Sequence, residues 1–69
     1  MTGAEFKSLR QAAGLTQQAL ADIAGLNIRQ IQRLEKGDVS PGGMAAKNLF
    51  AIADALNVDP RYLIEKAED

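Results

Sequence analysis

The sequence has 69 residues, which is enough for a single domain with a modest hydrophobic core, and we expect one domain over residues 1–69. It contains no cysteine and no histidine, which excludes disulfides, thiolate or imidazole metal ligands and the usual general base of enzymes. Its net charge of −1 argues against indiscriminate binding to polyanions.

The sequence also argues against a membrane or secreted protein. The longest apolar run, LFAIADAL, contains an aspartate and is too short to span a bilayer. The N-terminal stretch MTGAEFK lacks the basic flank and the apolar segment of a signal peptide. We therefore expect a cytoplasmic protein that does not contact a membrane.

The first predicted helix covers residues 3–13. Thr2 and Glu5 have the spacing of a capping box, in which each side chain accepts a hydrogen bond from the backbone N–H of the other residue. Gly14 can end the helix, because glycine readily adopts the left-handed conformation found at helix C-termini. One side of this helix is formed by Phe6, Leu9, Arg10 and Ala13.

Three further helices are predicted to begin with the same pattern, a capping residue that has an apolar residue directly before it and another four positions after it. The side chains of Thr16, Asn27 and Asp59 can each accept hydrogen bonds from the first helical turn. The apolar residue before each cap and the one four positions after it are spaced as a hydrophobic staple. These helices are predicted over residues 17–24, 28–36 and 60–67, with staples that join Leu15 to Leu20, Leu26 to Ile31, and Val58 to Leu63.

The remaining helix is predicted over residues 44–56, after the loop-forming stretch DVSPGG. Its apolar residues recur at helical spacing, and Asn57 can take the left-handed turn at its end. Neither Ser40 nor Gly43 is a decisive cap, so the start of this helix is the least defined boundary. No segment alternates as a strand does, and the chain is predicted to be all-α with five helices.

Only the three residues GLN join helix 17–24 to helix 28–36. So short a turn does not allow antiparallel stacking, and the second helix must leave at a steep angle, as in a helix-turn-helix. At 100° per residue, helix 28–36 has a core side with Ile31, Leu34 and Glu35 and an outward polar side. Gln30 lies behind the polar side and fits best as the capping partner of Asn27. The polar strip consists of Arg29, Gln32, Arg33 and Lys36.

This polar strip has the chemistry needed to read a DNA major groove. Arginine presents two parallel donors to guanine O6 and N7, and glutamine can donate to and accept from adenine. Gln17 and the free N–H groups of the first turn of helix 17–24 form a natural phosphate clamp. Such a strip is usually only a solvated helix face, but its combination with two capped helices and a three-residue turn favours DNA binding. Basic residues also outnumber acidic ones over residues 7–36, and the reverse holds over residues 37–69.

The sequence resembles a known family in two segments. LRQAAGLTQQALADIAGLNIRQIQRLEKG resembles the helix-turn-helix of the lambda-repressor-like family, also called the Cro or XRE type, and LFAIADALNVDPRYLIE resembles the two helices that complete its five-helix domain. The resemblance covers roughly residues 4–65 and implies a compact fold in which helix 28–36 is the recognition helix. It implies a structural ion pair between Arg10 and Glu35. By position, it also implies base contacts from Ile28, Arg29, Gln32 and Arg33, and phosphate contacts from Gln17 and Lys36.

The sequence departs from the family pattern in two places. Ile28 stands where many relatives have a polar side chain, so it either contacts a thymine methyl group or covers the edge of the core. The segment between Gly37 and Leu49 is about three residues longer than is common, and Asp38 would repel phosphates if it faced DNA. Which contacts residues 38–48 make is therefore open, and Lys47 either restores one or is a plain surface residue.

We expect a domain that binds double-stranded DNA sequence-specifically, as a small transcriptional regulator, without catalytic residues, metal, cofactor or small-molecule ligand. Because one recognition helix reads only a few base pairs, a homodimer on two half-sites is expected. With no further domain expected after Asp69, association would use this domain's own surface or be induced by DNA. The alternative is a protein-interaction module, such as an antitoxin-like or phage-encoded adaptor, which the negative net charge favours. The acidic residues, among them Asp54, Asp59 and Glu65, form no paired arrangement that would indicate an enzyme.

Overall fold

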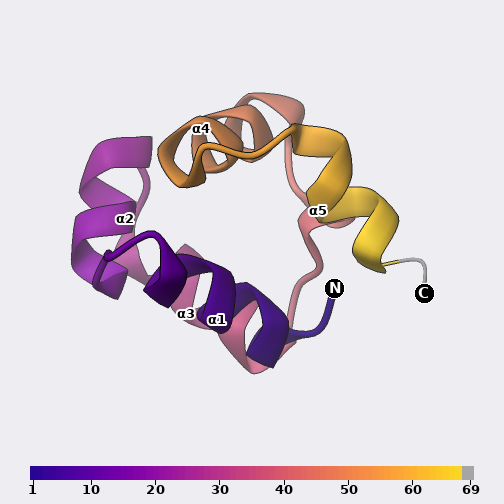
Figure 1. Cartoon of the computed structure of the whole chain (residues 1–69), viewed down its shortest axis with the longest axis horizontal. Coiled ribbons are helices and arrows are strands. Elements are labelled where there is room, and N and C mark those ends of the chain that lie inside the picture. Colours follow the sequence, from indigo (N-terminus) through magenta and orange to yellow (C-terminus); the bar gives the residue numbers. More distant parts are fainter. Residues whose placement is uncertain (68–69) are drawn as a thin grey trace.

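The computed structural model describes residues 1–67, and it describes side chains for residues 1–64, so the side chain of Glu65 lies outside the description. All regular structure in the described part is helical, as predicted (Figure 1). None of the described helices is long and apolar enough to cross a membrane. In chain order the elements are α1 (Gly3–Ala12), α2 (Gln17–Ala24), α3 (Ile28–Lys36), the short 3₁₀ helix η1 (Pro41–Gly43), α4 (Ala46–Leu56) and α5 (Pro60–Ala67).

Side-chain caps explain why four of the five α-helices begin where the sequence predicts. Each cap satisfies a backbone N–H that has no partner within its helix, which contributes about 1 kcal/mol. Glu5 and Gln30 also accept from the N–H groups of the capping residues, which completes the capping boxes of α1 and α3. The four capping bonds join Glu5 N to Thr2 Oγ1 (3.1 Å), Ala19 N to Thr16 Oγ1 (3.0 Å), Arg29 N to Asn27 Oδ1 (2.9 Å) and Arg61 N to Asp59 Oδ1 (2.8 Å).

The start predicted for α4 is wrong by two residues, because the helix begins at Ala46 and not at residue 44. Pro41 is buried, and η1 packs against α5. Met44 and Ala45 then keep extended backbone, with ψ angles of 157° and 139°, and no side chain caps α4. The helix therefore begins only after this buried turn and the two extended residues that follow it. The end of α1 also differs from the prediction, by one residue, since the helix stops at Ala12.

The hydrophobic core lies where the five α-helices meet. In Figure 1, α4 lies above α1, with α2 closing one side and α5 the other. α3 contacts both α1 and α2, and α4 contacts both α2 and α5. In each predicted staple the second residue is buried and the first packs against the core. Burial of one leucine or isoleucine contributes about 1.5–3 kcal/mol. The buried hydrophobic residues are Phe6, Leu20, Ala21, Ile31, Leu34, Leu49, Ile52, Ala53, Leu56 and Leu63.

Gly3 allows the first turn of α1 to approach the last turn of α3 closely. A Cβ atom at this position would overlap the backbone carbonyl of Glu35, and it would lie 3.0 Å from the backbone nitrogen of Gly37. The obstacle is backbone, which cannot rotate away as a flexible side chain can. The glycine at position 3 is therefore required by the contact between two helices.

We predict that Gly3→Ala lowers the free energy of unfolding by about 1–3 kcal/mol, because the added methyl group forces α1 away from α3. Urea denaturation monitored by circular dichroism measures the change. Gly42→Ala is the matched control, since a Cβ there would meet only Ile64 Cγ2, at 3.9 Å. Equal stability of the two variants would contradict the proposed close packing.

Candidate nucleic-acid interface

The turn between α2 and α3 sets the direction in which α3 leaves. Gly25 ends α2 in the left-handed conformation, with φ of 71°, which favours glycine over other residues. The N–H of Leu26 donates to the carbonyl of Ala21 at 2.8 Å, and the side chain of Leu26 packs against the core. Asn27 then caps α3. The turn is thus fixed by a glycine, an apolar anchor and a cap, and it forms the predicted helix-turn-helix.

α3 has two chemically different sides, as predicted. Ile31 and Leu34 are buried in the core, and the half-buried Gln30 serves the capping box. The outward side carries three bases, and none of them forms an ion pair with a described side chain. The exposed residues on this side are Arg29, Gln32, Arg33 and Lys36, which we call the polar strip.

Ile28 is half-buried and packs against the core. The structure thus assigns it the packing role that the sequence left open. Its remaining exposed surface lies at the start of α3, beside Arg29. A contact between this surface and a thymine methyl group stays a prediction.

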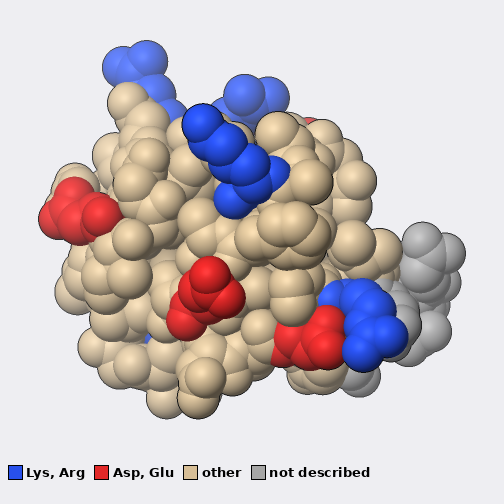
Figure 2. All heavy atoms as spheres, turned by 90° about the horizontal axis from the view of Figure 1, so that it is seen from above, with Lys and Arg blue, Asp and Glu red and all other residues tan. Residues whose placement is uncertain are grey.

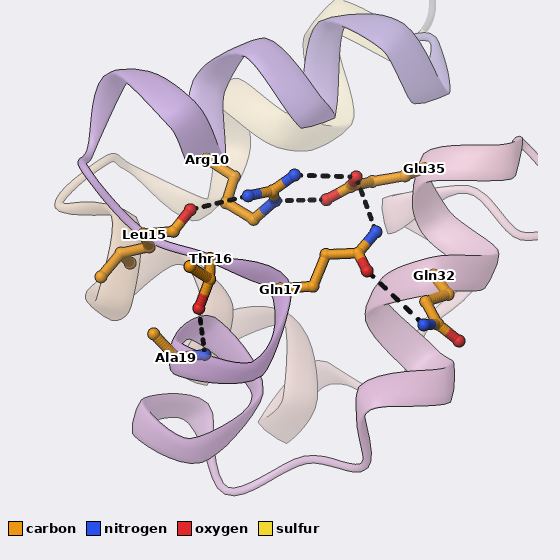
Figure 3. Close-up of polar contacts among 7 residues, drawn as sticks. All are labelled: Arg10, Leu15, Thr16, Gln17, Ala19, Gln32 and Glu35. Carbon is orange, nitrogen blue, oxygen red and sulfur yellow. Dashed lines mark hydrogen bonds and ion pairs between the residues drawn. The ribbon is translucent and has the colours of Figure 1, made fainter.

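A buried ion pair between Arg10 on α1 and Glu35 on α3 is confirmed (Figure 3). Arg10 Nε donates to Glu35 Oε2 at 2.6 Å, and Arg10 Nη2 donates to Glu35 Oε1 at 3.2 Å. The third nitrogen, Nη1, donates to the carbonyl of Leu15 at 2.7 Å. The two side chains are only 8% and 6% exposed. Arg10 therefore faces the interior and is not available to DNA.

The surroundings of Glu35 lower its pKa. Burial by itself raises the pKa, because it disfavours the charged carboxylate. The hydrogen bonds from Arg10 and Gln17, with the positive charges of Arg10 and Lys7, outweigh burial and hold the pKa below its usual range. Glu35 is thus ionised at neutral pH, and the pair stays charged.

Gln17 connects this ion pair to the polar strip, which sequence reasoning did not detect. Its Nε2 donates to Glu35 Oε1 at 3.1 Å, and its Oε1 accepts a long hydrogen bond, of 3.5 Å, from Gln32 Nε2 (Figure 3). The amide nitrogen has two hydrogens, so one remains for the predicted phosphate contact. In the sequence, only its position as the first residue of α2 indicated a functional role for Gln17, as a phosphate contact. The link to Glu35 depends on side chains from different helices.

Two hollows border the polar strip, one on each side. The larger, which we call the basic hollow, has a volume of about 430 Å³ and lies toward α1 and α2. The smaller, of about 170 Å³, lies toward residues 38–48, and its lining includes Gln30, Arg33, Met44 and Asn48. The strip is therefore a ridge between two depressions. The basic hollow is lined by Lys7, Gln17, Gln32, Glu35 and Lys36, so it brings together the two predicted phosphate-contact residues.

Charge is unevenly distributed over the surface. Figure 2 shows basic side chains along the upper edge of one face, whereas acidic side chains lie at its left and near its middle. At the lower right a basic side chain lies against an acidic one. Lys47 and Asp38 are both exposed, so the structure leaves both available to solvent without assigning either a DNA contact.

We predict that Glu35→Gln lowers the free energy of unfolding at pH 7 by about 3 kcal/mol, because Arg10 would remain buried without a counter-charge. Chemical denaturation measures the effect. Asp59→Asn is the control: it removes the exposed pair of Asp59 with Arg61, whose side chains are 52% and 79% exposed, but keeps a capping side chain. Stability should then hardly change. An equal response of both variants would contradict a structural role for Glu35.

The pH dependence of stability provides a second test with the same variant. Since the pKa of Glu35 is lowered by folding, its contribution is fully present above the ordinary value of 4.5 and is lost as the pH falls through the folded-state pKa. The stability difference between the parent and Glu35→Gln should therefore be constant near neutral pH and shrink in acid. A difference that persists down to pH 2 would show that the charge of Glu35 is not the cause.

Residues 6–63 match the profile of the helix-turn-helix family. The chain is 34% identical over 67 residues to the uncharacterized HTH-type transcriptional regulator y4aM of Sinorhizobium fredii, an alignment that covers 97% of this chain and 45% of that protein. It is 34% identical over 64 residues to an uncharacterized 15.4 kDa protein in the HgiDIIM 5′ region of Herpetosiphon aurantiacus, covering 93% of this chain and 44% of that protein. The chain thus spans less than half the length of these curated relatives.

Among solved structures, the fold is similar to that of the restriction-modification controller protein C.AhdI from Aeromonas hydrophila. The TM-score is 0.75 and the sequence identity 33%, with 88% of each chain covered. The similarity includes the compact all-helical arrangement predicted from the sequence. The chain therefore belongs to the helix-turn-helix family, with the lambda-repressor-like fold.

Proposed function

We propose that this domain binds double-stranded DNA sequence-specifically, with α3 in the major groove, and that it acts in transcriptional regulation. The proposal rests on one observation above all, the exposed polar strip on a helix whose opposite side is anchored in the core. The bases of this strip form no ion pair with any side chain that the structure describes. The relatives support it, because one is described as a transcriptional regulator and another as a restriction-modification controller.

The side chains of the polar strip differ in what they can recognise. Arg29 and Arg33 can each present two donors to guanine, and Gln32 can pair with adenine. Lys36 has three donors and no fixed geometry, which suits a phosphate. Specificity therefore comes from the two arginines and the glutamine, with Ile28 as a further candidate, whereas Lys36 and Gln17 contribute affinity.

We propose that the functional unit is a homodimer, formed in solution or on DNA. A single recognition helix reads too few base pairs for useful specificity, and two copies bind half-sites about one helical turn apart. The proposed activity involves no covalent chemistry, cofactor or small-molecule ligand, and its place is the cytoplasm, where duplex DNA is accessible.

A protein-interaction module, such as an antitoxin-like or phage-encoded adaptor, is the second candidate. The exposed apolar side chains of Ile23, Phe50 and Tyr62, which are 61%, 54% and 42% exposed, favour it, together with the net charge of −1. Such a partner would be bound through apolar surface. Its binding would therefore depend little on salt, whereas binding to DNA weakens steeply as salt rises.

The experiment that tests the proposal selects bound sequences from a random duplex pool and then titrates the enriched duplex at two salt concentrations. DNA binding predicts an enriched site and a steep loss of affinity with salt. A two-fold symmetric site would support the dimer, and a single asymmetric site would contradict it. Absence of binding at every salt concentration would overturn the DNA proposal.

We predict that Arg33→Ala weakens binding to the selected site by about 1–3 kcal/mol and relaxes the base preference at one position, because a bidentate contact is lost. Lys36→Ala is the comparison, since loss of a phosphate contact should weaken selected and random duplexes alike. Fluorescence anisotropy with both duplexes measures the two effects. Equal weakening of both duplexes by Arg33→Ala would show that Arg33 does not read a base.

A further inference from the structure

Lys7 lies on α1, outside the helix-turn-helix, yet it lines the basic hollow together with Lys36 of the polar strip. We propose that Lys7 is a phosphate-binding residue and that the basic hollow receives one backbone phosphate of the DNA strand beside α3. This inference rests on the proposed DNA binding. It assigns a DNA contact to α1. The sequence predicts no such contact on this helix, whose Arg10 is buried in the ion pair with Glu35.

The electrostatics of the basic hollow favour an anion. Its one acidic residue, Glu35, is 6% exposed, and both of its carboxylate oxygens accept hydrogen bonds from Arg10. The buried pair has no net charge. The exposed charges are those of Lys7 and Lys36, neither of which forms an ion pair with a described side chain. The charges of Lys7, Lys36 and the neutral pair sum to a positive charge at the hollow, which attracts an anion.

The hydrogen-bonding groups of the hollow also suit a phosphate. Each lysine ammonium can donate to a phosphate oxygen without a strict geometry. Gln17 Nε2 uses one hydrogen for Glu35 and has a second one available. The donors come from α1, α2 and α3, so a single phosphate would be held by all three helices.

The position of the hollow points to a DNA phosphate. The major groove is about 12 Å wide, close to the diameter of about 10–12 Å of a helix with its side chains. When α3 fills the groove, the sugar-phosphate backbones that border it must therefore lie along the two flanks of the helix. The basic hollow forms one of these flanks, next to Gln32 and Lys36. A lysine there adds affinity without reading sequence.

The test measures DNA affinity against salt concentration for the parent, Lys7→Ala, Lys7→Arg and Ser8→Glu. Lys7→Ala should lower the slope of log affinity against log salt by about one and the affinity at 0.1 M salt by about eightfold, equally on selected and random duplexes. Lys7→Arg should bind as the parent does. Ser8→Glu is the matched control: it changes the net charge by the same unit one residue along α1, but Ser8 lines a different hollow, with Met1 and Tyr62. It should leave the slope unchanged.

A second measurement locates the contact. Duplexes with a single neutral methylphosphonate linkage, moved one position at a time, should reveal a position where the modification weakens Lys7→Ala less than it weakens the parent, because Lys36 and Gln17 still contact that phosphate in the variant. Thermal unfolding of the exposed Lys7→Ala variant should match that of the parent, which separates binding from folding. The parent should also show no saturable binding of inorganic phosphate at constant ionic strength, and saturable binding there would overturn the assignment to the DNA backbone.

The outcomes distinguish this inference from the function on which it rests. If the parent binds no DNA at any salt concentration, the proposed function fails and the inference with it. If the parent binds DNA but Lys7→Ala keeps the slope and the methylphosphonate profile of the parent, only the role of Lys7 is refuted. A slope change of the same size in Ser8→Glu would also refute it, because the effect would then follow net charge.

Discussion

The ion pair between Arg10 and Glu35 is the interaction on which the rest of the structure depends. Two charged side chains leave water there, and the cost of removing them is recovered only when every hydrogen-bonding group finds a partner. Those partners come from α1, from the turn at Leu15, from the start of α2 and from α3. The pair is therefore satisfied only when these elements converge, and it fixes the last turn of α3 against α1. Gly3 serves the same contact, because a Cβ at this position would overlap the backbone carbonyl of Glu35.

The orientation of α3 follows from that anchoring. Ile31 and Leu34 are buried on one side of α3, and the polar strip on the other side therefore faces solvent. Rotating the helix to hide the strip would bury unpaired arginines and expose two core residues, both of which are costly. The exposed strip is thus a consequence of core packing. The hollows beside it turn the strip into a ridge, a shape that fits a groove.

The scaffold and the polar strip are built by different residues of the chain. Helix caps, the turn glycine and the core residues build a helix-turn-helix whatever the strip contains, and related proteins share that scaffold at about one-third identity. What such a domain reads depends on the side chains of the strip and of its flanks. Gln17 belongs to both groups, since it donates to the buried carboxylate and accepts from Gln32. The side-chain amide of Gln17 therefore links the buried ion pair to the polar strip.

The sequence by itself determined the features that depend on neighbours along the chain. Thr2, Thr16, Asn27 and Asp59 cap the first turn that follows them, and the apolar spacing decides which side of each helix is buried, so the helices and the polar strip were predictable. Tertiary structure decided the rest. α4 starts late because Pro41 is buried and η1 packs against α5, and no local pattern contains that contact. The partners of Gln17, the close approach at Gly3 and the hollow shared by Lys7 and Lys36 likewise join residues far apart in sequence. Such contacts exist only once the helices have packed, which is why periodicity and capping could not reveal them.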